Sequence, residues 1–160
     1  MYYVGVDLGG TNIAVGIVTY EGKIIAKKSV KTMAERPFEE IIKDMADCTL
    51  ALLKETNISL DEVKSIGIGS PGSLDTENGV LKYANNFANG RNVPMKAILQ
   101  KYIDKPVYIG NDANVAALGE QRFGAGKGYN DVIVVTLGTG VGSGIICDGK
   151  LLEGKMGAGG

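Results

Sequence analysis

The opening third of the chain alternates short polar turns with runs of apolar, mostly β-branched residues. Such runs at residues 3–8, 12–20 and 23–31 predict consecutive strands of a meander. After Pro37, apolar residues recur at helical spacing as far as Asn57, which predicts a long helix with one buried face. The predicted face consists of Phe38, Ile41, Ile42, Met45, Thr49, Leu52 and Leu53.

Further along the chain, strands and helices alternate. Short apolar runs at 65–69 and 106–110 predict two strands, and we expect helices from Pro94 and from Asn111 to about Phe123. The apolar face of the helix at Pro94 consists of Met95, Ile98, Leu99, Tyr102 and Ile103. Strands that alternate with helices after an opening meander predict an α/β fold with a sheet of mixed direction.

Glycine concentrates in two similar stretches, 4–18 and 132–146, each of which joins two β-branched segments. Each stretch predicts a hairpin with bare backbone at its tip, where successive N–H groups can bind phosphate oxygens. Either stretch alone would also fit an ordinary glycine-rich turn. Because Asp7 precedes one tip and Thr139 lies within the other, the pair favours two loops that hold a polyphosphate from two sides.

Two other nucleotide-binding motifs do not fit. The dinucleotide-binding fingerprint opens a helix, whereas both glycine stretches continue as strands, through Ile17-Val18 and Ile145-Ile146. A P-loop ends in Gly-Lys followed by Ser or Thr, but Gly126-Lys127 is followed by Gly128 and lacks the hydroxyl that binds Mg²⁺. The hairpin type of phosphate loop remains.

Polar residues lie where predicted strands end. Asn111 and Asp112 come between a strand and a helix, the usual ligand position in open α/β sheets. Asp112 either caps that helix or acts as a general base that takes a proton from a substrate hydroxyl during phosphoryl transfer. Asn86 and residues 69–72 lie in loops after strands, where they suit either a hydroxylated ligand or simple turns.

Composition and charge exclude several classes of protein. A formal net charge of −1 over 160 residues gives no electrostatic footprint for nucleic acid or an anionic membrane, and no segment resembles a signal peptide or a membrane span. The chain has no histidine, which excludes Ser-His and Cys-His catalysis within it. Cys48 and Cys147 are expected to be buried, small apolar side chains rather than a disulfide or metal pair. We therefore expect a soluble, cytoplasmic protein.

Four motifs, in this order, resemble those of the ROK (repressor, open reading frame, kinase) family of sugar kinases, and most closely its bacterial glucokinases. They are Asp7-Leu8-Gly9-Gly10-Thr11, Gly69-x-Pro71-Gly72, Asn111-Asp112-Ala113-Asn114-x-Ala116-Ala117-x-Gly119-Glu120 and Leu137-Gly138-Thr139-Gly140-Val141-Gly142-x-Gly144. The resemblance covers the whole chain. It implies a ribonuclease H-like fold of the actin and hexokinase type, and ATP-dependent phosphorylation of a hexose hydroxyl, with glucose the expected sugar and Mg²⁺ as cofactor.

The resemblance also implies roles for individual residues. Asp7 would lie at the phosphate end and contact Mg²⁺ through water, and Asp112 would be the catalytic base. Two phosphate-binding loops would consist of Gly9, Gly10 and Thr11, and of Gly138, Thr139 and Gly140. Contacts to the sugar would come from Gly69, Ser70, Pro71, Gly72, Asn86 and Asn111. Where many relatives carry Pro-Gly-Trp, this chain has Ala88-Asn89-Gly90.

The strand–turn–strand pattern restarts after a glycine-rich linker. We therefore expect residues 1–121 to form a ribonuclease H-like domain, and residues 122–160 to form the linker and first hairpin of a second, truncated domain of the same kind. One apolar face of this hairpin would lack a covering helix or sheet, either Ile133, Val135, Ile145 and Cys147 or the alternate set. The family continues with a Glu-Ile-Gly-His segment and a structural zinc site, so the 160 residues alone are expected to be inactive, and the full-length kinase to be a homo-oligomer.

The alternative function is a sugar-responsive regulator of the same family, or a sugar-binding module without kinase activity. Regulators of the family carry a helix-turn-helix ahead of the first strand, whereas Met1 stands two residues before that strand here. We therefore expect sugar and ATP as partners, and neither nucleic acid nor a membrane.

Overall fold

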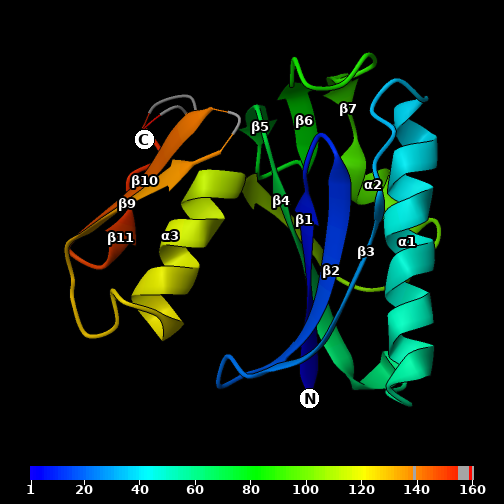
Figure 1. The fold of residues 1–160 in the computed structure, drawn as a ribbon, viewed down its shortest axis with the longest axis horizontal. Helices are drawn as coiled ribbons and strands as arrows, with labels where there is room; N and C mark the ends of the chain where they lie inside the picture. The colour runs from blue at the N-terminus through cyan, green and yellow to red at the C-terminus, as the bar shows by residue number, and fades with distance from the viewer. Residues whose placement is uncertain (139, 155–158, 160) are drawn as a thin grey trace. The chain divides into compact units, whose positions relative to one another are not determined.

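The computed structural model describes residues 1–138, 140–154 and 159. It divides into two compact units, Met1–Gly110 and Asn111–Gly160, and Figure 1 shows the elements of each. Within the described residues, no helix is both long enough and apolar enough to cross a membrane.

The first unit is built on a five-stranded sheet with the order β3-β2-β1-β4-β8. Its strands are β1 (Tyr2–Leu8), β2 (Asn12–Thr19), β3 (Ile24–Lys31), β4 (Val63–Ser70) and β8 (Val107–Asn111). The first three form the predicted antiparallel meander, and β4 runs parallel to β1. The predicted sheet of mixed direction is therefore confirmed.

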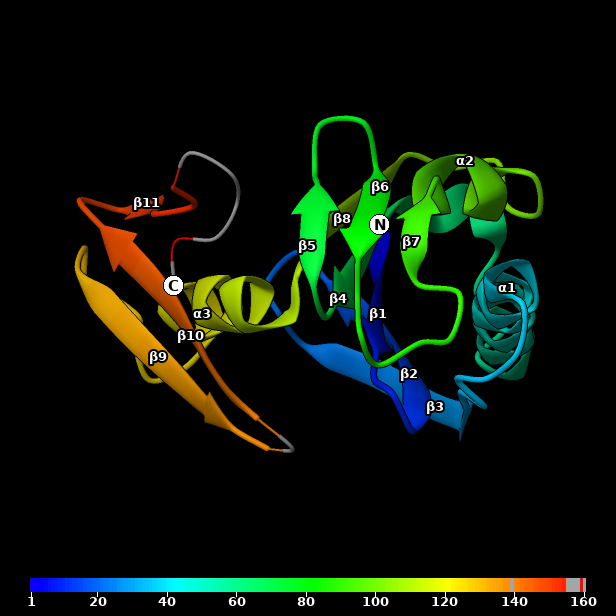
Figure 2. The ribbon, with the colours of Figure 1, turned by 90° about the horizontal axis from the view of Figure 1, so that it is seen from above.

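Helix α1 (Phe38–Glu55) packs against β2 and β3 (Figure 2). Every position of its predicted apolar face is buried, because residues spaced three and four apart share one side of a helix. The sheet supplies the opposing apolar layer, since alternate residues of β1 and β2 are buried in the period-two pattern of a half-exposed strand. Cys48 lies in this core, where burial raises the pKa of its thiol and keeps it protonated.

The chain between β4 and β8 departs from the prediction. Three short strands, β5 (Ser73–Asp75), β6 (Val80–Tyr83) and β7 (Arg91–Val93), form a small antiparallel sheet that the sequence did not predict. Helix α2 (Met95–Gln100) begins after Pro94 as expected but is short. Tyr102 therefore lies beyond the helix and is exposed, whereas Ile103 is fully buried.

The second unit contains helix α3 (Asp112–Phe123) and a three-stranded sheet with the order β11-β10-β9. Its strands are β9 (Val132–Leu137), β10 (Val141–Cys147) and β11 (Lys150–Leu151). Helix α3 packs on β10 and β9 (Figure 2). This helix was expected in the first domain, but its contacts group it with the second unit, and the domain boundary after residue 121 stays a prediction.

The two faces of the second glycine hairpin differ. The expectation of an uncovered hairpin is wrong for the face with Ile146, because α3 packs there and Ile146 is buried. Among the described residues, Ile133, Val135 and Val141 on the other face are exposed. Cys147 is exposed too, which corrects the expectation that both cysteines are buried.

Candidate functional site

The first glycine turn joins β1 to β2 and is closed by hydrogen bonds to backbone atoms. The Gly9 N–H donates to the Asn12 carbonyl oxygen at 3.0 Å. The side chain of Thr32, the residue after β3, donates from Oγ1 to the Gly9 carbonyl oxygen at 2.7 Å. The Thr32 N–H donates to the Thr11 carbonyl oxygen at 3.0 Å. The buried residue Thr32 therefore holds the backbone of the turn in place.

Asn86 lies beside this turn. A Cβ built on Gly10 would lie 3.7 Å from both Cβ and Nδ2 of Asn86, which is ordinary van der Waals contact. The loop that carries Asn86 is anchored by Phe87, whose buried ring lies 5.0 Å from the ring of Phe38. The Ala88 N–H also donates to the carbonyl oxygen of Ala34 at 3.1 Å. The structure therefore brings together the predicted phosphate turn and a predicted sugar contact.

The segment 69–72, expected as a loop, begins within the sheet, because Gly69 and Ser70 are the last residues of β4 and only Pro71 and Gly72 lie between β4 and β5. Gly69 pairs with Asp7 across the parallel strands β4 and β1, and Ser70 is fully buried. Gly72 has φ +93°, and a Cβ there would lie 2.2 Å from the carbonyl oxygen of Tyr83. Only glycine fits this position, so the requirement for Gly72 is structural.

The sequence left open whether Asp112 caps the helix that follows it, and the structure gives the N-cap to Asn111. Asn111 is the N-cap of α3, and its Oδ1 accepts the N–H groups of Ala113 at 3.1 Å and Asn114 at 3.3 Å. Asp112 is the first residue of the helix, is exposed, and accepts the Ala113 N–H at 2.8 Å. A carboxylate in the first turn also favours the helix electrostatically. The capping position thus belongs to Asn111, which leaves the chemical role of Asp112 as a proposal.

The second glycine stretch serves two different purposes. Among the described residues, a Cβ on Gly138 or Gly140 would meet no atom within 4 Å. At Gly144, in contrast, a Cβ would lie 2.5 Å from Ala117 Cβ and 2.8 Å from the carbonyl oxygen of Ala113. The first two glycines are therefore open to the surroundings, while Gly144 allows α3 to approach β10. Thr139, predicted to bind phosphate, lies outside the described residues.

A set of hydrogen bonds connects the first glycine turn to α1, and nothing in the sequence predicted it. We call this set the brace; it consists of Thr32, Arg36, Asp44 and Asn89. Arg36 donates from Nη2 to the carbonyl oxygen of Thr32 at 2.9 Å and to Asp44 Oδ2 on α1 at 2.5 Å. Asn89 Nδ2 donates to the Arg36 carbonyl oxygen at 3.4 Å. Single threonine and arginine residues after a strand are common, and only the folded chain connects them to the glycine turn and to the loop of Asn86.

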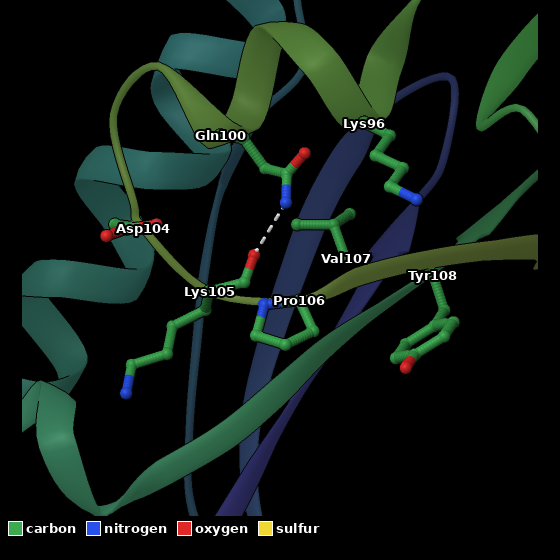
Figure 3. A pocket seen from close by; sticks show the side chains of 7 residues that line it. All are labelled: Lys96, Gln100, Asp104, Lys105, Pro106, Val107 and Tyr108. Carbon is green, nitrogen blue, oxygen red and sulfur yellow. Dashed lines mark hydrogen bonds between the residues drawn. The ribbon is translucent and has the colours of Figure 1, made fainter.

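The hollow in Figure 3 lies elsewhere in the first unit and measures about 390 Å³. It is lined by Lys96, Gln100, Asp104, Lys105, Pro106, Val107 and Tyr108. Gln100 Nε2 donates to the carbonyl oxygen of Lys105 at 3.0 Å. Because its lining includes none of the predicted site residues, this hollow is not part of the candidate site.

The chain is similar to known sugar kinases over nearly its whole length. It is 42% identical over 156 residues to a glucokinase from Thermotoga maritima, a match that covers 98% of this chain and 48% of the relative. It is 38% identical over 159 residues to a glucokinase from Halalkalibacterium halodurans, with 99% of this chain and 48% of the relative covered. The chain thus spans about half the length of the curated relatives it matches.

A solved structure agrees with these matches. It is a ROK family glucokinase from Streptomyces griseus in complex with glucose and AMPPNP, 38% identical, with a TM-score of 0.89 over 99% of this chain and 49% of that one. The mixed α/β fold is accordingly that of the actin and hexokinase type, as expected. Residues 3–160 match the sequence profile of the ROK family. The chain therefore belongs to the ROK family.

Proposed function

We propose that this chain is the N-terminal portion of a kinase that transfers a phosphoryl group from ATP to a hexose hydroxyl, with glucose the first sugar to test. The observation that carries the proposal is that Asn86 lies next to Gly10, so close that a Cβ on this glycine would lie 3.7 Å from Asn86 Nδ2. Transfer requires the phosphate and the accepting hydroxyl to lie roughly 3–3.5 Å apart. A turn that binds phosphate beside an amide that binds the hydroxyl would bring the two groups close to each other, and the position of Asn86 next to Gly10 supports this arrangement.

The phosphate end would be formed by backbone. Gly9, Gly10 and Thr11 form one loop, and the N–H groups of Gly138, Thr139 and Gly140 would form the other. Bare backbone of this kind binds phosphate oxygens through its N–H groups. The relative from Streptomyces griseus holds AMPPNP together with glucose, which supports ATP as the phosphoryl donor.

Asp7 would face a magnesium ion bound to those phosphates. Protein sites for Mg²⁺ commonly use one or two carboxylates and complete the octahedron with water and substrate phosphates, and a single Asp at the carboxyl end of β1 fits that pattern. Among the described residues, no group of three or more Asp, Glu, Cys or His side chains gathers as a metal site. The chemistry that Mg²⁺ supplies in such kinases is neutralisation of charge on the phosphates.

Asp112 would act as the general base. Its carboxylate would accept the proton of the sugar hydroxyl while that oxygen bonds to the γ-phosphorus and the bond from phosphorus to the ADP oxygen breaks. Asn111 would fix the start of the helix and contact the sugar, as would Asn86 and the turn of Gly69, Ser70, Pro71 and Gly72. Because Asn111 provides the cap, the carboxylate of Asp112 is not needed for it.

The test compares Asp112→Asn with the wild type in the full-length kinase, with Mg²⁺-ATP, glucose and other hexoses, and a coupled assay for ADP. We expect kcat to fall about 10²–10⁴-fold, because the amide keeps the shape but loses the proton acceptor. Asp61→Asn is the matched control, because Asp61 is an exposed carboxylate in the short 3-10 helix Leu60–Glu62. Turnover by Asp112→Asn close to that of the wild type would contradict the assignment. Sugar binding by the wild type without ADP release would favour the regulator or the sugar-binding module.

A further inference from the structure

We propose that Thr32 is a positioning residue that orients the peptide between Gly9 and Gly10 so that the Gly10 N–H faces the phosphate. The inference rests on the proposed function, since it assigns a task to a residue behind the phosphate turn. Thr32 has an exposed fraction of 0%. It therefore acts through the backbone of the turn rather than by touching a substrate.

Thr32 holds the turn at two points. Its Oγ1 donates to the carbonyl oxygen of Gly9 at 2.7 Å, and its N–H donates to the carbonyl oxygen of Thr11 at 3.0 Å. The two carbonyl groups belong to the Gly9–Gly10 and Thr11–Asn12 peptides. These two peptides lie on either side of the Gly10–Thr11 peptide, and both are tied to the same buried residue.

The geometry of the peptide bond determines where the Gly10 N–H points once Thr32 binds the Gly9 carbonyl oxygen. No cis peptide bond occurs in the described residues, and in a planar trans peptide the C=O and N–H groups point to opposite sides. A Gly9 carbonyl aimed at the buried hydroxyl of Thr32 therefore sends the Gly10 N–H away from the core. Glycines on both sides of a peptide allow it to rotate readily, so the orientation depends on a partner such as this hydroxyl.

Thr32 is itself fixed from α1. Arg36 Nη2 donates to the carbonyl oxygen of Thr32 at 2.9 Å and also to Asp44 Oδ2 at 2.5 Å. Asn89 donates to the carbonyl oxygen of Arg36 at 3.4 Å. The brace thus connects the glycine turn to α1 and to the loop that carries Asn86.

The experiment compares Thr32→Val, which keeps the shape but loses the donor, with Thr32→Ser, which keeps the donor. In the full-length kinase, Thr32→Val should raise both the KM and the calorimetric Kd for Mg²⁺-ATP by about 3- to 10-fold, the size expected for one lost hydrogen bond. The KM for glucose should stay unchanged, and Thr32→Ser should restore ATP binding. If Thr32→Val does not fold by circular dichroism, Thr32→Ala takes its place with the same expectation.

Thr49→Val is the matched control. Thr49 has an exposed fraction of 1%, and its Oγ1 donates to the carbonyl oxygen of Met45 at 2.7 Å, within α1 and away from the turn. This variant should lose stability with no change in ATP affinity. Wild-type ATP affinity in Thr32→Val, or an equal loss of affinity in Thr49→Val, would overturn the inference.

Calorimetry separates this inference from the proposed function. If the wild type binds Mg²⁺-ATP without transferring phosphate to any hexose, the kinase proposal fails while the comparison at Thr32 still decides the inference. If the wild type binds no ATP, both are overturned.

Discussion

A methyl group added at Gly144 should push α3 away from the hairpin. Its carbon would lie 2.5 Å from Ala117 Cβ, 2.8 Å from the carbonyl oxygen of Ala113 and 3.2 Å from Asn114 Cα. Carbon atoms in contact prefer about 3.5–4.0 Å, so β10 and α3 must separate by roughly 1 Å. Because two of these atoms belong to the backbone of α3, no change of rotamer relieves the overlap.

Separating β10 from α3 would slow the proposed phosphoryl transfer, because it would displace Asp112. The helix carries Asp112 at its first position, and the hairpin carries Gly138 and Gly140 at its tip. A displacement of about 1 Å between reacting groups can cost on the order of 10²-fold in rate, and overpacking costs about 1–3 kcal/mol of stability. We therefore expect Gly144→Ala to lower kcat about 10²-fold, while the KM for ATP changes little.

The assay is steady-state ADP release by the full-length kinase, corrected for the folded fraction from thermal unfolding. Gly119→Ala is the matched control, because a Cβ on this glycine of the same helix meets no atom within 4 Å among the described residues. It should keep full activity and stabilise the helix by up to about 1 kcal/mol. Ala117→Gly added to Gly144→Ala removes the closest overlap and should recover part of the rate.

Two results would refute this reasoning. The first is a kcat for Gly144→Ala within a few-fold of the wild type, which would mean that α3 and the hairpin accommodate the methyl group without moving Asp112. The second is a loss of activity that follows the loss of folded protein alone. In that case Gly144 matters for stability but not for alignment.

Two further predictions concern the phosphate loops and the chain as a whole. Gly140→Val should weaken ATP binding and leave glucose binding unchanged. The open position of Gly140 would receive a branched side chain where a phosphate oxygen must approach. A calorimetric titration in which both ligands bind normally would contradict this prediction. The 160 residues alone should release no appreciable ADP with glucose and Mg²⁺-ATP, because catalysis by positioning depends on both sides of the site. Turnover equal to that of the full-length kinase would show that the remaining part is dispensable.

The elements with long, regular patterns could be predicted from the sequence. The meander and α1 repeat their apolar residues over several turns or strand pairs, so that local spacing alone determines them. The small sheet of β5, β6 and β7 was missed because strands of three or four residues hold too few positions for a period to show. Tyr102 was misplaced for a similar reason, since nothing in the local pattern indicates that α2 ends at Gln100.

The candidate site was predictable as a set of motifs but not as a set of contacts. The ordered motifs include Asp7 and Asp112, and the family resemblance that they carry implied one site for these two residues and for Asn86. The hydrogen bonds of Asn111, which give it the cap, could not be predicted, because Asn and Asp are equally good N-caps. The role of Thr32 was also hidden, since it depends on a turn that lies 23 residues earlier in the chain.

The glycines, too, are alike in their sequence motifs but differ in their contacts. In the sequence, Gly10, Gly72, Gly138, Gly140 and Gly144 all belong to similar glycine-rich motifs. In the structure, Gly72 and Gly144 are required by the protein itself, because a Cβ there would meet backbone atoms at 2.2 Å and 2.8 Å. A Cβ on Gly10 would make only ordinary contact, and one on Gly138 or Gly140 would meet no described atom within 4 Å. Packing of the described chain does not explain glycine at these three positions, whereas a ligand that approaches the backbone closely would explain it. These are the positions at which the phosphates of ATP are proposed to bind.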